Sequence, residues 1–251
     1  MPRKISQSLL LLFVCVTLLV TGCTANSTTP NTEVSNQTSS SQTQLANKYS
    51  YLPKLNGKAT VVMTVNASPI TIEVDGTNAP ITAGNFVDLV QKGVYDGLAF
   101  HRVVREPQPF VVQGGDPQSK DLNVPLKNLG TGGFIDPTTS TRRYIPLEIK
   151  PQKATEPVYS KTLESVGIQQ QPLLSHTRGA VAMARSQLPD SASSQFYFAL
   201  TDLPFLNGNY AVFGYVTQGM KEVVDNIEAG DRIESAKVVE GLENLTIPNR
   251  S

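Results

Sequence analysis

The sequence has an arginine inside a run of apolar residues that reads as a β-strand, and this arginine is a candidate functional residue. Arg102 stands in the run Phe100-His101-Arg102-Val103-Val104, and Gln113 stands in a second run that starts at Phe110 and ends in a glycine turn. Because side chains alternate between the faces of a strand, pairing of the two runs would bring Arg102, Phe110 and Gln113 together beside an apolar patch. A guanidinium held there can donate hydrogen bonds to a bound substrate. The alternative is a solvated charge on an edge strand.

Written out, FHRVV…FVVQGGDP resembles the signature of the cyclophilin family of peptidyl-prolyl cis/trans isomerases. Two further segments resemble the same family in the same order. The first is GAVAMARS at 179–186 with SQFYF at 194–198, and the second is FLNGNYAVFG at 205–214 with VTQGM at 216–220. The resemblance covers roughly residues 58 to 240 and favours a bacterial, cyanobacterial-like lipoprotein form of the family.

The resemblance implies a fold and a site. The fold would be a closed eight-stranded antiparallel barrel with its binding groove on the outside. The catalytic residues would be Arg102, Gln113 and Phe110. The substrate-binding residues would be Val111, Ala184, Arg185, Gln195, Tyr197, Phe205, Leu206 and Tyr210.

Isomerisation of an X-Pro bond needs neither a nucleophile nor a proton transfer. The barrier of ~18–20 kcal/mol comes from amide resonance, so a catalyst must stabilise a twisted amide whose nitrogen has gained a lone pair. Arg102 would donate a hydrogen bond to that nitrogen. By the resemblance, Gln113 and Gln195 would bind substrate carbonyls, and the main chain near residues 184–185 would bind the extended peptide like an added strand.

An apolar slot for the proline ring follows from the same resemblance. Its walls would be Phe110, Val111, Tyr197, Leu206 and Phe205, with Tyr210 at the rim. The sequence departs from well-known eukaryotic members here. Phe205 replaces a tryptophan, Tyr210 a histidine, Arg185 an asparagine and Tyr197 the usual phenylalanine.

Other conspicuous residues are interpreted as structural. Phe196 and Phe213 are assigned to the core. His101 should face away from Arg102, and His176 is interpreted as an ordinary loop residue. Two separated histidines and two cysteines near the start of the chain offer no metal-ligand cluster, so neither a metal nor another cofactor is expected.

Strand-like and helix-like stretches alternate through the folded part. Helical spacing after Pro80, with Gly93 to end it, predicts one helix, and 220–227 predicts a second. Strands are predicted at 58–65, 69–74, 95–105, 110–113, 179–184, 195–200, 210–216 and 233–239. Many short strands with two helices indicate a mainly β fold: a closed barrel with two capping helices.

One stretch, about 118–177, is longer than the corresponding loop of compact cyclophilins. The extra length is expected between Ile149 and Ser175. A long loop is usually functional or disordered, and the plain alternative is a surface insertion without a catalytic role.

The beginning of the chain carries targeting features. Arg3 and Lys4 precede an apolar run from about Leu9 to Val20, which is typical of a secretory signal; a single transmembrane anchor is the alternative. The ending Val20-Thr21-Gly22-Cys23 resembles a bacterial lipobox. We therefore expect a lipoprotein signal peptide at 1–22 and lipidation at Cys23.

Residues 24–50 are almost entirely polar, which predicts a flexible linker over 23–50 between the lipid anchor and a domain at 51–251. The formal net charge is zero, with 21 basic and 21 acidic residues and no basic stripe, so nucleic acid is not expected as a partner. The expected partners are proline-containing polypeptides and, through Cys23, the extracytoplasmic (periplasmic) face of a cell membrane. We expect a monomer.

Two alternatives to a folding isomerase remain. The chain could be a low-turnover chaperone or binding module for Pro-containing segments, or a purely structural envelope lipoprotein. The joint presence of Arg102, Phe110 and Gln113 favours the enzyme.

Overall fold

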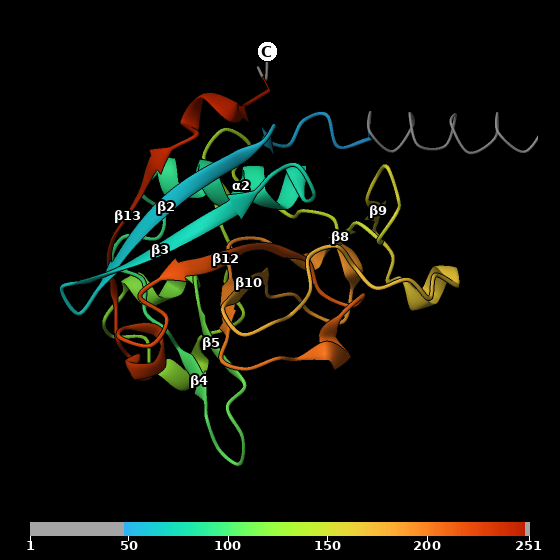
Figure 1. The fold of residues 1–251 in the computed structure, drawn as a ribbon. Coiled ribbons are helices and arrows are strands. Elements are labelled where there is room, and N and C mark those ends of the chain that lie inside the picture. Colours follow the sequence, from blue (N-terminus) through green and yellow to red (C-terminus); the bar gives the residue numbers. More distant parts are fainter. Residues whose placement is uncertain (1–47, 249–251) are drawn as a thin grey trace, which may run out of the picture. The chain divides into compact units, whose positions relative to one another are not determined.

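An eight-stranded antiparallel sheet is the frame of the computed structural model, which describes residues 48–248. The sheet curls around a buried core (Figure 1). Its strands follow the order β13 (Ile233–Glu240), β2 (Lys58–Val65), β3 (Ser68–Asp75), β12 (Val212–Gln218), β10 (Ala180–Met183), β11 (Phe196–Ala199), β5 (Val111–Gly114) and β4 (Arg102–Val104). The predicted mainly β architecture is confirmed.

The two edge strands of this sheet, β13 and β4, do not form a ladder with each other. Residues just before β4 bond to the start of β13 instead: the amides of Gly97 and Phe100 donate to the carbonyls of Ile233 and Asp231, at 2.7 and 2.8 Å. The strand predicted at 95–105 is therefore reduced to the three residues of β4. Gly97, with a φ of 83°, turns the chain out of the extended conformation at that point.

The hairpin of β2 and β3 follows the period-two pattern of its sequence. Buried and partly exposed positions alternate along both strands. The turn consists of Asn66 and Ala67, whose φ values of 50° and 58° match the twist of a two-residue hairpin loop. The inward side chains join the main core with the aromatic rings of Phe86, Tyr95, Phe100, Phe196, Phe198 and Phe213. The assignment of Phe196 and Phe213 to the core is confirmed.

The first predicted helix is α2 (Pro80–Gln91), which begins with a proline at its first turn and is followed by Gly93 in the left-handed region. Its N-terminal amides are capped from far along the chain. The N–H groups of Ile81 and Thr82 donate to the Glu148 carboxylate at 3.1 and 2.7 Å. Burial raises the pKa of Glu148, while these hydrogen bonds oppose that shift.

The prediction of a second helix at 220–227 is wrong. The segment is a turn that ends in the short 3-10 helix η6 (Val224–Asn226). The amides of Val224 and Asp225 reach back five residues, to the carbonyls of Gly219 and Met220. The segment is short and contains the β-branched pair Val223-Val224, both buried, so tertiary packing decides its backbone.

A buried ionic cluster ties α2 to the long stretch at 118–177. Arg143 donates to Asp88 at 2.5 Å and to Asp136 at 3.2 Å, and its guanidinium lies 4.8 Å from the ring centre of Phe134. Lys92 also pairs with Asp88, one helical turn away. All but Lys92 have nearly inaccessible side chains, so this cluster holds charge inside the protein.

The long stretch at 118–177 is ordered by small hairpins. β6 (Ile135–Asp136) pairs with β7 (Thr141–Arg142), and β8 (Glu148–Ile149) pairs with β9 (Val158–Tyr159). The part expected to hold the extra length has its own apolar cluster of Leu147, Ile149, Leu163 and Ala211. It therefore packs against the segment that follows Phe205.

The remaining elements are short. β1 (Lys54–Leu55) pairs with β14 (Leu245–Thr246). The other 3-10 helices are η1 (Pro117–Lys120), η2 (Leu126–Asn128), η3 (Glu164–Val166), η4 (Pro189–Ser191), η5 (Pro204–Leu206) and η7 (Leu242–Asn244).

The predicted signal peptide, the lipidation site Cys23 and nearly all of the predicted linker lie outside the described residues. Within 48–248, no helix combines the length and apolar character that crossing a membrane requires.

Candidate functional site

The ladder register brings two of the three predicted catalytic residues, Arg102 and Gln113, into one row. The third, Phe110, lies just before β5 and outside the row. Arg102 on β4 lies opposite Gln113 on β5, Gln113 lies opposite Tyr197 on β11, and Tyr197 lies opposite Ala182 on β10. Directly paired residues point to the same face of a sheet. The intervening residues Val112 and Phe198 are fully buried in the main core, so this row lies on the outer face.

A pocket of about 230 Å³ opens on this face. It is lined by Arg102, Phe110, Val111, Gln113, Ala184, Arg185, Tyr197, Leu206 and Tyr210. Its apolar floor belongs to a second cluster of buried residues that includes Val111, Ala182 and Tyr197 and is distinct from the main core. Most of the residues predicted for the proline slot therefore meet in one cavity.

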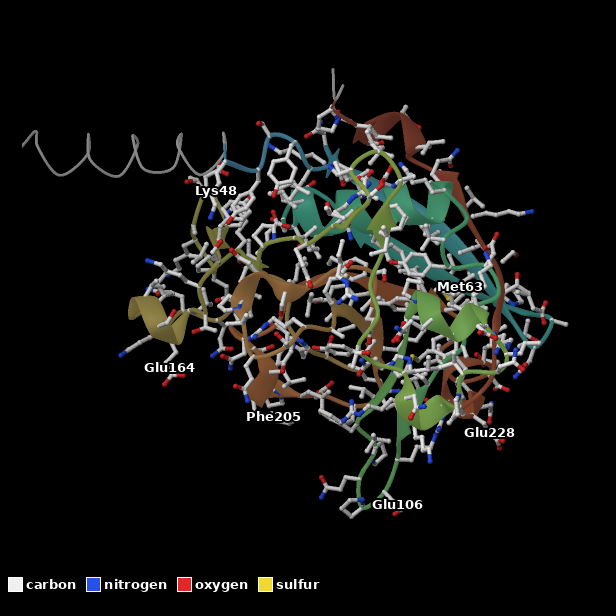
Figure 2. All side chains as sticks on the ribbon, turned by 180° about the vertical axis from the view of Figure 1, so that it is seen from behind. Lys48, Met63, Glu106, Glu164, Phe205 and Glu228 are labelled. Atoms are coloured by element: carbon white, nitrogen blue, oxygen red, sulfur yellow. The ribbon has the colours of Figure 1, made fainter. Side chains whose placement is uncertain are left out.

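Phe205 is placed differently from the other predicted wall residues. Its side chain is 65% exposed, and its ring stacks on that of Phe110 with centroids 6.1 Å apart. Figure 2 shows Phe205 at the surface, on the same side of the picture as Glu106 at the tip of the loop between β4 and β5. Phe205 therefore supports Phe110 from outside and does not line the pocket.

Arg102 is exposed and points its guanidinium over the pocket. Its Nη1 donates to Gln113 Oε1 at 3.3 Å, and the guanidinium carbon lies 5.5 Å from the ring centre of Phe110. In the part of the chain that the structure describes, no carboxylate lies within ion-pair distance of Arg102. Most of its five donors thus remain available to a substrate.

A chain of side-chain amides orients Gln113. Its Nε2 donates to Gln195 Oε1 at 3.0 Å, and Gln195 Nε2 donates to the carbonyl of Gly132 at 2.8 Å. This direction of donation leaves the carbonyl oxygen of Gln113 facing Arg102. Gln195 is only 8% exposed and lies behind Gln113, so its own amide is already engaged within the protein.

The loop that ends this amide chain is itself fixed by a buried carboxylate. Asp116 Oδ2 accepts from the amides of Gly130 and Gly132 at 2.6 and 3.0 Å. A Cβ at position 132 would lie 1.9 Å from Asp116 Oδ1, so only glycine fits this approach. The conformation of the loop at residues 130–132 therefore depends both on the carboxylate of Asp116 and on the glycine at position 132.

A second, larger pocket of about 330 Å³ adjoins the first and shares Gln113, Ala184 and Arg185 with it. Its other lining residues are mostly small or polar: Gly130, Thr131, Gly132, Arg142, Tyr144, Ser186, Ser191, Ser193 and Gln195. Two adjoining pockets, one with an apolar floor and one lined mostly by small or polar residues, suit an extended peptide that places neighbouring residues in each.

Arg185 shapes the wall between the pockets. Its Nε and Nη2 donate to the Asn209 carbonyl at 3.0 and 2.6 Å, and its guanidinium lies 4.6 Å from the ring centre of Tyr210. The ring of Tyr210 in turn meets Tyr197 edge-on, with centroids 6.2 Å apart. The side chain of Arg185 thus holds the rim of the slot.

The two histidines differ. His101 is partly buried, and burial lowers its pKa. The interpretation of His176 as an ordinary loop residue is wrong. It is 2% exposed, its Nε2 lies 2.9 Å from the Tyr197 hydroxyl, and its Nδ1 lies 3.1 Å from Asn207 Oδ1. A signal was present, because a buried tyrosine where phenylalanine is usual needs a hydrogen-bond partner.

Protein stability is expected to fall as the pH is lowered from about 6.5 towards 4, because burial lowers the pKa of His176 to about 4 from 6.5. Within that window the unfolded chain binds the proton and the folded chain does not, so acid favours unfolding. The full shift corresponds to on the order of 3 kcal/mol.

Urea unfolding of the unmodified protein and of His176→Gln between pH 4 and 7 measures this effect. The difference between the two cancels the other titrating groups. As the pH falls from 7 to 4, the free energy of unfolding of the unmodified protein should fall more than that of His176→Gln. A difference between the two proteins that is independent of pH would contradict the argument.

Comparison with known proteins agrees with this geometry. The model of the family described as cyclophilin type peptidyl-prolyl cis-trans isomerase/CLD matches residues 60–247. A Synechocystis protein named as a thylakoid lumen peptidyl-prolyl cis-trans isomerase is 43% identical over 212 residues, which cover 80% of this chain and 52% of the relative. A chloroplastic peptidyl-prolyl cis-trans isomerase of Arabidopsis thaliana is 38% identical over 224 residues, covering 82% of this chain and 48% of the relative.

The chain thus spans about half the length of these two relatives. Among solved structures, a cyclophilin type peptidyl-prolyl cis-trans isomerase of Cryptosporidium parvum matches with a TM-score of 0.52 and 22% identity, covering 73% of this chain and 98% of that one. At this identity the likeness shows the fold. The resemblance seen in the sequence motifs is confirmed by the family match: the chain belongs to the cyclophilin type peptidyl-prolyl cis-trans isomerase family.

Proposed function

We propose that this protein is a peptidyl-prolyl cis-trans isomerase that assists the folding of extracytoplasmic proteins. One observation carries the proposal: Arg102, Gln113 and Tyr197 lie in one cross-strand row, and all three line a pocket with an apolar floor. A guanidinium with donors to spare beside such a pocket matches the demands of rotation about an X-Pro bond.

The geometry supports a mechanism based on differential binding. A planar amide nitrogen is a poor hydrogen-bond acceptor, whereas the nitrogen of the twisted amide carries a lone pair. Arg102 would donate to that lone pair, so this interaction forms mainly in the transition state and lowers the barrier. Gln113 accepts from Arg102 at 3.3 Å and thereby keeps the guanidinium over the pocket.

Substrate binding would be divided between the two pockets. The proline ring would enter the pocket floored by Val111 and Tyr197, with Phe110, Leu206 and Tyr210 around it. The residues before the proline would extend along the main chain near Ala184 towards the polar pocket. Gln195 would act through Gln113, because its amide is engaged within the protein.

An exchange measurement on a proline-containing tetrapeptide tests this proposal. The domain at residues 43–251, which forms one compact unit, should accelerate cis/trans exchange of the peptide well above the uncatalysed rate. If the domain bound the peptide without accelerating exchange, the low-turnover binding module would replace the enzyme. If it did neither, both would fail.

We propose an extracytoplasmic location, with the domain held to a membrane through a lipid on Cys23. Support comes from the lipobox-like ending Val20-Thr21-Gly22-Cys23 and the polar stretch after it. The lumenal location in the name of the Synechocystis relative agrees with export from the cytoplasm. Under this proposal residues 1–22 are a signal peptide, the linker begins at Cys23, and the protein works as a monomer on proline-containing polypeptides. The linker ends before Tyr49 and not at residue 50 as predicted, because the side chain of Tyr49 is 4% exposed and belongs to the main core.

Replacing Cys23 by Ser is expected to abolish lipid attachment, because the thioether that carries the lipid needs the cysteine sulfur. Cells that express the protein and are fed a radioactive fatty acid should label the unmodified chain but not the Cys23→Ser chain. Cys15→Ser serves as the matched control and should keep the label, since Cys15 lies within the segment that would be removed. Label retained in the Cys23→Ser protein would contradict the anchor.

A further inference from the structure

The hydroxyl of Tyr197 lies beneath the proline slot, and its hydrogen-bond partner among residues 48–248 is His176. Tyr197 is 5% exposed, and its hydroxyl oxygen lies 2.9 Å from Nε2 of His176. The two rings are nearly parallel, with an angle of 16° and centroids 6.1 Å apart. The hydroxyl therefore faces the imidazole, and the slot meets the apolar part of the tyrosine ring.

Asn207 fixes the tautomer of this imidazole. Its Oδ1 accepts from the backbone amide of His176 at 2.8 Å, which sets the orientation of the asparagine side chain. The same oxygen lies 3.1 Å from His176 Nδ1, so Nδ1 must carry the proton and donate. His176 Nε2 is then left with a lone pair, and the Tyr197 hydroxyl must donate to it.

Other contacts hold His176 in place from both sides. Its carbonyl accepts from the amide of Leu203 at 2.7 Å, and Asn207 Nδ2 donates to Gln171 Oε1 at 3.3 Å. Gln171 belongs to the inserted stretch, and Asn207 follows η5 in the wall of the slot. The series Gln171, Asn207, His176 and Tyr197 thus runs from the insertion to the floor of the slot.

We propose that His176 is a positioning residue for catalysis: by accepting the hydroxyl hydrogen of Tyr197 it fixes the ring that floors the proline slot and keeps the hydroxyl out of that slot. This inference rests on the proposed isomerase function. Without the acceptor, the hydroxyl would lose its buried partner and could be satisfied only by turning towards substrate or admitting water. Either change makes the slot less suited to a proline ring.

The tautomer can be read directly, without substrate. The full chain contains only two histidines, so ¹⁵N-histidine labelling gives spectra of two imidazoles, and His101→Gln assigns them. At neutral pH the His176 ring should show a protonated Nδ1 and an unprotonated Nε2. A protonated Nε2 would overturn the inference, whatever the activity.

Two matched substitutions of the full chain then test positioning. His176→Gln places an amide oxygen near the former Nε2 and should keep kcat/KM close to that of the unmodified protein. His176→Asn is too short to reach Tyr197 and should lower kcat/KM by roughly 2- to 10-fold, the range for one hydrogen bond, mainly through KM. In a Tyr197→Phe background, His176→Asn should cause no further loss, because the hydroxyl is already absent.

Equal activity of the two His176 variants, or an undiminished effect of His176→Asn in the Tyr197→Phe background, would overturn the inference. An inactive unmodified chain would instead overturn the proposed function. In that case the affinity for a proline-containing tetrapeptide, measured by NMR titration, would be compared among the same variants. His176→Gln should keep the affinity, and His176→Asn should lower it except in the Tyr197→Phe background.

Discussion

Replacing Arg102 by Ala is expected to lower kcat/KM for a proline-containing peptide by ~10²–10³, the cost of removing one donor to a transition-state charge. The reason is local. Arg102 is the cation that lies over the apolar pocket with donors to spare, and it meets the place where the proline nitrogen would develop its lone pair. The loss should appear largely in kcat, because the interaction forms in the twisted state. Peptide exchange measured by NMR at several concentrations separates the two parameters.

Controls for this substitution follow from the structure. Arg102 is exposed, so Arg102→Ala should leave the circular dichroism spectrum and the unfolding midpoint nearly unchanged. Arg102→Lys keeps the charge but loses the planar guanidinium with its several donors. Its kcat/KM should lie between those of the unmodified protein and Arg102→Ala. Lys221→Ala removes an exposed cation that does not line either pocket and should keep full activity. A folded Arg102→Ala protein with near-full activity would show that the mechanism is wrong.

Replacing Arg143 by Met is expected to lower the free energy of unfolding by ~3–5 kcal/mol, because it removes the buried cation that two buried carboxylates share. Asp88 is completely inaccessible and Asp136 nearly so, and Arg143 bonds to both. Lys92 remains beside Asp88 and limits the loss. Urea unfolding followed by fluorescence or circular dichroism gives the free energy, and the slope of the transition shows whether the folded state stays compact.

A matched pair on the surface provides the control. Lys58 and Glu73 form an ion pair of 2.7 Å with side chains 58% and 46% exposed, so Lys58→Met should change stability little. Adding Asp136→Asn to Arg143→Met should restore part of the loss, because it removes one of the two negative charges that Arg143 offsets. If the Arg143 and Lys58 substitutions cost the same, burial of the charge would not be the cause.

The outer-face row was predictable because it depends on short-range rules. Alternation along two strands puts Arg102 and Gln113 on one face, and the family motif supplies the register that adds Tyr197. The position of Phe205 was not predictable in this way. It lies in the short 3-10 helix η5 and outside the ladders of the sheet, so no side-chain alternation decides whether its ring enters the pocket or lies outside against Phe110.

Two other differences have the same origin in tertiary contacts. The spacing at 220–227 suits a helix, but the burial of Val223 and Val224 against the sheet imposes a wider turn. His176 has no local pattern at all. Its burial depends on Asn207 and Tyr197, which are distant in sequence, and only the tyrosine in a phenylalanine position hinted at a buried polar partner.

Because Glu148 caps α2, the start of this helix depends for its stability on a residue far along the chain. The amide of Thr82 finds its acceptor 66 residues further along the chain, so the first turn of α2 has no side-chain cap of its own when it forms. A helix of 12 residues without such a cap is marginal in water. The start of α2 and the segment carrying β8 therefore gain protection from solvent in the same cooperative unit, although β8 follows α2 by more than fifty residues.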